Sequence, residues 1–162
     1  MRMTMITSTE GQLSRCCVKF HNSVQQWKRI SVRGLNELQT ISQAKFSIDR
    51  KEAVGKLLLV ELELCGVVEM LNKLCVNIKA TSELMCNDDI ITPMTIYAHC
   101  CTIQRSYSEE LSVRRKIVQE VMAAGEMKTC YSSTWLHEPF ISCSNCDELL
   151  HSVLVLSGNK ST

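Results

Sequence analysis

Two cysteines near the end of the chain have a spacing that could bind a metal ion. Cys143 and Cys146 are separated by two residues, and His137 and His151 flank them, so the four side chains could complete one zinc site. The same cysteine pair could do redox chemistry, because a helix N-terminus lowers the pKa of a thiol. No second cysteine pair has this spacing, and no βαβ pattern surrounds the first. We therefore expect no metal site. If one existed, Cys143 and Cys146 would be its candidate ligands.

The rest of the sequence lacks the motifs that carry catalysis or cofactor binding. It has no phosphate-binding glycine loop, no HExxH zinc motif and no nucleophile between a strand and a helix. The four histidines are scattered along the chain, and no secretory signal precedes the ten cysteines. We expect reduced thiols that pack as small apolar groups, no enzyme activity and no cofactor.

Aromatic residues gather in one stretch, residues 131–140, which we name the Trp135 segment. It reads Tyr-Ser-Ser-Thr-Trp-Leu-His-Glu-Pro-Phe and contains one of the two tryptophans and one of the two prolines. Its apolar area is too large for a solvent loop, and its pattern lacks the periodicity of a long helix. The segment is therefore expected to dock, either within the protein or on a partner.

The charges of the chain are uneven although their sum is small. The net charge is +1, but basic residues dominate up to residue 36 and acidic residues dominate from residue 51 to residue 90. Helices of opposite charge are more often neighbours than separate binders of charged ligands. The weak net charge and the lack of a base-reading motif indicate no direct nucleic-acid partner. The most apolar run, residues 57–71, is too short to span a membrane.

The spacing of apolar residues predicts an all-α fold that begins with a helix over residues 12–46, after a flexible stretch over residues 1–11. The heptad stripe of this helix consists of Leu13, Cys17, Phe20, Val24 and Trp27. Its next two positions carry Ser31 and Gly34, so we expect the stripe to slip there. The predicted continuation is Leu35, Leu38 and Ile41.

A second helix, predicted over residues 49–86, has the strongest pattern in the chain. Its apolar seam, with spacings of three and four, is Leu57, Val60, Leu64, Val67, Leu71, Leu74, Ile78, Thr81 and Met85. Further apolar residues beside the seam widen this face, so we expect contacts with more than one helix. A rise of 1.5 Å per residue gives this helix a length of roughly 55 Å.

A third helix is predicted over residues 93–125, after an interruption at residues 87–89. Thr92 is its expected N-cap and Gly125 its expected stop. Its apolar face consists of Cys100, Ile103, Tyr107, Leu111, Val118 and Val121. Glu110 and Arg114 are four positions apart, so we expect them to form an ion pair on the helix surface.

Residues 127–158 hold the Trp135 segment and a short last helix, before a tail over residues 159–162. Asn145 is the expected N-cap of that helix, with Glu148 completing a capping box. Together these elements predict an elongated antiparallel helical bundle or coiled coil of three long helices plus a short C-terminal helix. The whole chain, residues 1–162, forms one domain.

Two tryptophan motifs in a defined order resemble a known family. The first lies in the first predicted helix and reads Phe20-His21-Asn22, with Trp27 five positions later. The second is the Trp-Leu-His-x-Pro-aromatic stretch of residues 135–140, which follows a charged helix. This order and spacing resemble the cyclin-dependent kinase 2-interacting protein family, from about residue 16 to residue 140.

The resemblance implies a non-catalytic adaptor or scaffold in the nucleus and cytoplasm. Such an adaptor links cell-cycle kinases in DNA replication and in checkpoint signalling after DNA damage, and is a subunit of an AAA ATPase complex in pre-60S ribosome maturation. Implied partners are cyclin-dependent kinase 2, replication-origin and checkpoint kinase components, AAA ATPase subunits and a helical co-subunit. The expected partner-binding residues are Phe20, His21, Trp27, Tyr131, Trp135, Leu136, His137, Pro139 and Phe140.

Two other hypotheses remain open for the sequence. One is a zinc- or thiol-dependent helical protein that uses Cys143 and Cys146. The other is a coiled coil with a purely structural role. The two tryptophans could also serve core packing alone, because buried aromatic side chains mostly contribute stability.

Overall fold

The computed structural model describes residues 2–85, 91–124 and 127–159, and these residues are almost entirely helical. The helices are α1 (Arg2–Gln43), α2 (Ser47–Leu84), α3 (Ile91–Ala124), α4 (Thr129–His137), α5 (Pro139–Cys143) and α6 (Cys146–Leu156). No strand occurs in the three described ranges. The all-α prediction is confirmed.

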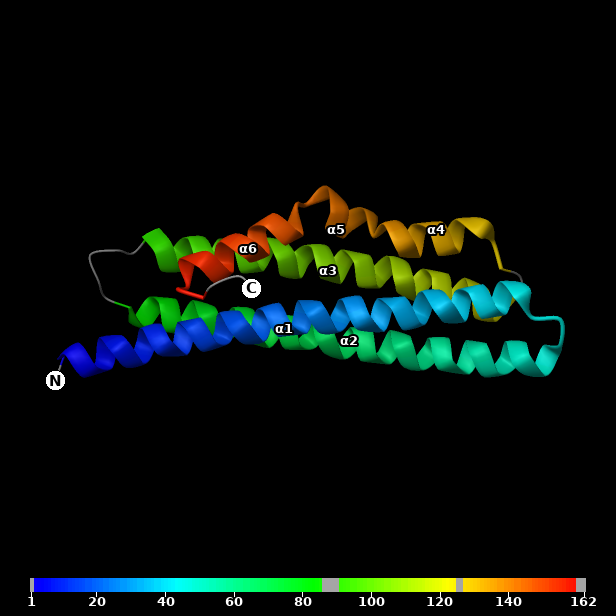
Figure 1. Ribbon diagram of the computed structural model, residues 1–162, viewed down its shortest axis with the longest axis horizontal. Helices are drawn as coiled ribbons and strands as arrows, with labels where there is room; N and C mark the ends of the chain where they lie inside the picture. Colours follow the sequence, from blue (N-terminus) through cyan, green and yellow to red (C-terminus); the bar gives the residue numbers. More distant parts are fainter. Residues whose placement is uncertain (1, 86–90, 125–126, 160–162) are drawn as a thin grey trace.

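The chain runs back and forth along one long axis (Figure 1). Each of the long helices α1, α2 and α3 runs opposite to the one before it, and α4, α5 and α6 return along α3. α2 packs against both α1 and α3, which confirms the prediction that this helix has more than one neighbour. α4 packs on α1, α5 packs on α3, and α6 packs on both α1 and α3.

The predicted apolar seam of α2 faces the core over its whole length. All of its residues from Leu57 to Thr81 are buried, and Met85 is packed against the core at the C-cap. The buried side chains of all six helices belong to one cluster, so a single hydrophobic core runs along the molecule. Burial of this continuous seam is the main source of stability for helices of this length.

The stripe of α1 does not slip where a slip was predicted. Ser31 and Gly34 are buried in register with Trp27, and Leu38 continues the stripe, whereas Leu35 is only half-buried. Two small residues keep seam positions because a large side chain from another helix, Trp135, fills the space that they leave. The interruption in the apolar pattern therefore marks a docking site on α1.

Two predicted helix ends differ from the structure. The first helix was predicted over residues 12–46, whereas α1 begins at Arg2 and ends at Gln43, so residues 2–11 are helical. Once a helix is nucleated, each further residue adds a hydrogen bond at little cost, and residues 2–11 hold no proline to stop it. Thr92 lies inside α3, not before it. The predicted interruption at residues 87–89 and the predicted stop at Gly125 lie outside the described residues.

The short C-terminal helices also depart from the prediction in detail. The Trp135 segment, whose pattern predicts no long helix, belongs to two short helices, α4 and α5, with a break at Glu138. Asn145 is the N-cap residue of α6, but its φ is 51° and its side chain makes no capping hydrogen bond, so the predicted capping box is absent. In the predicted tail, Asn159 accepts a hydrogen bond of 3.2 Å from Ser14 of α1.

Helices of opposite charge are neighbours, as the charge pattern indicates. Arg33 of α1 pairs with Glu63 of α2, and Arg115 of α3 lies 3.3 Å from Glu61 of α2. These pairs are partly exposed, so each contributes little stability but favours this pairing of helices. Among the described helices, none combines the length and the hydropathy that crossing a membrane requires.

Candidate interaction site

A buried arginine lies between the two tryptophans. The guanidinium carbon of Arg114 is 4.7 Å from the ring centre of Trp27 and 4.4 Å from that of Trp135. We name this group the Trp-Arg-Trp clamp (Trp27, Arg114 and Trp135). All three side chains are almost fully buried, and each belongs to a different helix, namely α1, α3 and α4. Cation–π contacts of this kind are strongest where water is excluded.

Besides its contacts with the two indole rings, the guanidinium of Arg114 makes hydrogen bonds through both Nη atoms. Arg114 Nη1 donates to Ser31 Oγ at 2.5 Å, and Nη2 donates to the Trp135 carbonyl oxygen at 3.3 Å. Nη2 also donates to Glu138 Oε1 at 2.7 Å, which makes an ion pair with a partly buried carboxylate. Only Nε lacks a partner in the described part of the chain. Arg114 thus ties α3 to α1, to α4 and to the break before α5.

Trp135 fits against α1 because the facing residues are small. Its indole Nε1 donates to the carbonyl oxygen of Ser31 at 2.9 Å. A Cβ atom at Gly34 would lie 2.2 Å from Trp135 Cζ2, so no larger residue fits at this position. On the other side of the clamp, Trp27 packs edge-on against Tyr107 of α3, with ring centres 5.1 Å apart. The two predicted tryptophan motifs therefore meet within the molecule.

Glu110 and Glu138 hold the turn between α4 and α5. Glu110 Oε2 accepts the backbone N–H of Phe140 at 3.0 Å, near the start of α5, where free backbone N–H groups favour a carboxylate. Glu138 has a φ of 45°, an unusual conformation for a residue with a side chain, and lies directly before Pro139. Its bond to Arg114 offsets the strain at this position.

The predicted surface ion pair between Glu110 and Arg114 is wrong. Both residues are 0% exposed, and the carboxylate that pairs with Arg114 is Glu138. The reason is the register of α3, since successive spacings of three and four from Tyr107 place Glu110 and Arg114 on the seam and not on the outer face. An i,i+4 spacing does not distinguish a buried pair of positions from an exposed one.

Burial disfavours the charged forms of both seam residues. It lowers the pKa of the Arg114 guanidinium, an effect that Glu138 and Glu110 oppose. Burial likewise raises the pKa of the Glu110 carboxyl, while the hydrogen bond from Phe140 opposes this shift. Arg114 has no exposed surface, so a ligand from solvent cannot reach it. This arrangement joins α3 to α1, α4 and the start of α5.

The nine predicted partner-binding residues fall into a buried group and an exposed group. Phe20, Trp27, Tyr131 and Trp135 are buried in the core, and His21 is half-buried. The exposed group consists of Leu136, His137, Pro139 and Phe140. Leu136 is 61% exposed and Phe140 is 41% exposed, which is high for large apolar side chains. The exposed group, which we name the Leu136 surface, flanks the break that the clamp holds.

The candidate metal ligands do not come together. Cys143 is exposed near the end of α5, whereas Cys146 is buried at the start of α6. Across the described ranges, no three side chains of His, Cys, Asp or Glu are arranged to hold a metal ion. Burial raises the pKa of Cys17 to about 11 and that of Cys75 to about 12, so these thiols are neutral apolar groups, as predicted.

Four residues of the site were not predicted to lie together, namely Ser31, Gly34, Glu110 and Arg114. Their positions in the sequence could have indicated the site. Each of them occupies a seam position of α1 or α3 where the heptad pattern predicts an apolar residue. Two small residues on one helix and two charged residues on another indicate a polar layer in the core. Glu138 carries no comparable signal, since its role depends on the turn that it forms.

Neither a model of a known protein family nor a curated protein matches this sequence.

Proposed function

We propose that this chain is a non-catalytic adaptor. It links cell-cycle kinases, including cyclin-dependent kinase 2 and replication-origin and checkpoint kinase components, in DNA replication and DNA-damage signalling. It is also a subunit, with a helical co-subunit, of an AAA ATPase complex in pre-60S ribosome maturation. The chain works in the nucleus and the cytoplasm, as an antiparallel coiled-coil bundle.

The observation that carries the adaptor proposal is the rigid presentation of the Leu136 surface. Arg114 and Trp135 hold α4 on the long helices, and Glu110 holds the start of α5. Leu136 and Phe140 lie next to these held positions with much of their apolar area in water. Apolar residues on a fixed frame bind a partner without the entropy cost of ordering a loop.

The clamp also supports a role without chemistry. Its one charged group, Arg114, is buried and is already bonded to Ser31, to the Trp135 carbonyl oxygen and to Glu138, so it offers no free acid or base to a substrate. Shape and exposed apolar area remain the features that a partner can recognise.

Direct binding measurements with purified proteins test the proposal. Isothermal titration calorimetry would measure the affinity of this chain for cyclin-dependent kinase 2 and for AAA ATPase subunits. The double variant Leu136→Ala, Phe140→Ala should weaken binding by about tenfold or more, because anchoring apolar residues dominate such interfaces. Its thermal unfolding should match that of the wild type, since surface substitutions change stability little.

The matched control is Ile48→Ala, which removes an exposed apolar side chain in the first turn of α2, outside the Leu136 surface. It should bind as the wild type does. The proposal fails if the wild type binds none of these proteins, or if the double variant and the control bind alike. Trp135→Ala is a further comparison, because it should lose partner binding together with α4 packing, as expected of a buried residue.

A further inference from the structure

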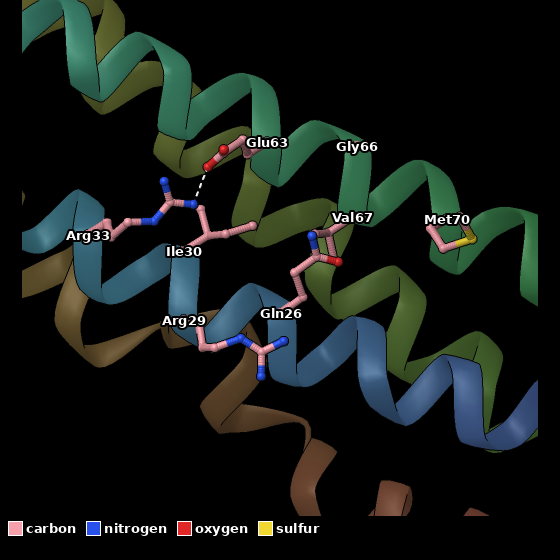
Figure 2. A pocket seen from close by; sticks show the side chains of 8 residues that line it. All are labelled: Gln26, Arg29, Ile30, Arg33, Glu63, Gly66, Val67 and Met70. Carbon is pink, nitrogen blue, oxygen red and sulfur yellow. Dashed lines mark hydrogen bonds and ion pairs between the residues drawn. The ribbon is translucent and has the colours of Figure 1, made fainter.

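A groove lies between α1 and α2, and no residue of the Leu136 surface lines it (Figure 2). We name it the Arg29 groove; it encloses about 580 Å³. The residues that matter are Arg29, Ile30 and Arg33 of α1 and Glu63, Gly66 and Met70 of α2. α4, α5 and α6 pack on α1 and α3, so they leave this side of the α1 and α2 pair open.

The floor of the Arg29 groove is apolar and has a notch. Ile30 is buried at its base, and Met70 is 46% exposed at its end. Gly66 is exposed, and an added Cβ atom there would meet nothing within 4 Å. A partner side chain can therefore enter between the two helices at Gly66, as ridges of one helix enter grooves of another.

Exposed apolar residues extend the floor along α2. Leu59 is 61% exposed and Leu62 is 67% exposed, and they precede Gly66 and Met70 at spacings of three, four and four. Residues with these spacings lie along one side of a helix. A strip of α2 about two to three turns long therefore presents apolar side chains next to the groove.

The α1 side of the groove is basic and only partly neutralised. Arg33 is paired with Glu63, as Figure 2 shows, but within the described ranges Arg29 makes no ion pair. Arg15 and Lys19 are also exposed, and no acidic residue occurs between residues 11 and 36. A partner that carries carboxylates on this side would pair with charges that the chain itself leaves unmatched.

We infer that the Arg29 groove binds an amphipathic α-helix of a second protein, with its apolar ridge over Gly66 and Met70 and its carboxylates facing Arg29. A helix fits because its own backbone groups are satisfied and its side chains form a ridge. The apolar ridge of the partner helix would pack on the exposed apolar residues of α2. A row of carboxylates beside that ridge would face the basic residues of α1. The inference rests on the adaptor proposal, to which it adds a second binding surface and the class of partner.

A pair of designed peptides provides the probe. Each is a helical peptide of about 20 residues with leucines at spacings of three and four. One carries glutamates beside the leucine ridge, and the other carries lysines at the same positions. Fluorescence anisotropy with the full chain should show binding of the glutamate peptide, and about tenfold weaker binding of the lysine peptide. Arg29→Glu should reverse this preference.

The two exposed glycines of α2 give a matched control for the notch. Gly66→Leu fills the groove and should weaken binding of the glutamate peptide by about tenfold, whereas Gly55→Leu lies outside the groove and should bind as the wild type does. Both glycines have open space around them, and leucine favours a helix more than glycine does. Both variants should therefore fold.

Four results would overturn the inference. The peptides could bind equally well, or Gly66→Leu could bind like Gly55→Leu. Light scattering could show a dimer that Gly66→Leu dissociates, which would make a second copy of this chain the occupant. A double-stranded DNA probe could bind in dependence on Arg29 but not on Gly66, which would assign the basic row to phosphates. If the Arg29 groove proves not to bind a helix, the adaptor proposal still stands, provided that the Leu136 surface binds its purified partners.

Discussion

Gly34 of α1 lies against the indole ring of Trp135 of α4, so closely that a methyl group at Gly34 would stand 2.2 Å from Trp135 Cζ2. The missing side chain lets α4 approach the long helices. It also brings the Trp135 ring centre to 4.4 Å from the guanidinium carbon of Arg114, which lies 4.7 Å from the Trp27 ring centre. One glycine on the α1 seam is therefore a condition for the Trp-Arg-Trp clamp.

Gly34→Ala should destabilise the protein by about 1–3 kcal/mol, because overpacking forces Trp135 or α1 to move. The control is Gly55→Ala in α2, where the added methyl group meets no neighbour. That variant should be more stable than the wild type by about 0.5–1 kcal/mol, owing to the higher helix propensity of alanine. Urea unfolding measures both. Equal effects of the two substitutions would contradict the packing of Trp135 on Gly34.

Arg114→Ala should cost about 3–5 kcal/mol, because it leaves a cavity between two indole rings and removes the partner of Glu138. The neighbouring Arg115→Ala is the control. Arg115 pairs with Glu61 at the surface, so its loss should cost less than about 1 kcal/mol. The free energy of unfolding from urea titration distinguishes the two. A loss below 1 kcal/mol for Arg114→Ala would show that the clamp does not hold the fold together.

Glu110→Gln should change how stability depends on pH. Burial raises the pKa of the Glu110 carboxyl in the folded protein above its ordinary value of 4.5. A raised folded pKa means that the folded state holds the proton more tightly, so stability is lost as the pH rises from the unfolded pKa through the folded pKa. Glutamine keeps an oxygen for the Phe140 N–H but does not titrate.

The measurement for Glu110 is the difference in free energy of unfolding between wild type and variant, followed by urea titration from about pH 4 to about pH 8. The wild type should lose stability relative to Glu110→Gln as the pH rises. Parallel curves for the two proteins would show that Glu110 has the same pKa in the folded and unfolded states, contrary to its burial.

Cys100→Ser should destabilise the protein by about 1–3 kcal/mol, because the hydroxyl replaces a fully buried thiol whose pKa is raised by burial. Cys143→Ser should change stability by less than about 0.5 kcal/mol, since Cys143 is exposed. Thermal unfolding measures both effects. Zinc bound in stoichiometric amount to the wild type, detected by mass spectrometry and lost in Cys143→Ser, would instead favour the zinc-dependent hypothesis.

The long helices could be predicted because helix periodicity is a local property of the sequence. The α2 seam shows this best, since residues from Leu57 to Thr81 are all buried as their spacing indicates. Helix ends were less predictable, and α1 begins at Arg2. Residues 2–11 carry no apolar stripe of their own. They are helical because they continue the helix that follows them in the chain.

The clamp could be predicted only in part. Both tryptophans were recognised as important, but their contact across Arg114 depends on how α1, α3 and α4 pack. The i,i+4 spacing of Glu110 and Arg114 predicted a pair on the helix surface. Their burial is tolerated here because the backbone of Phe140, the side chain of Glu138 and two indole rings replace water.

The sequence by itself determined which residues form helices and which helix faces are apolar, because both follow from spacing within a few turns. It also placed the aromatic residues of the Trp135 segment after a charged helix. The tertiary structure decided which of those residues are buried and which remain at the surface. Trp135 enters the core while Leu136 stays exposed because Ser31 and Gly34, distant in the chain, leave room for one side chain and not for the other.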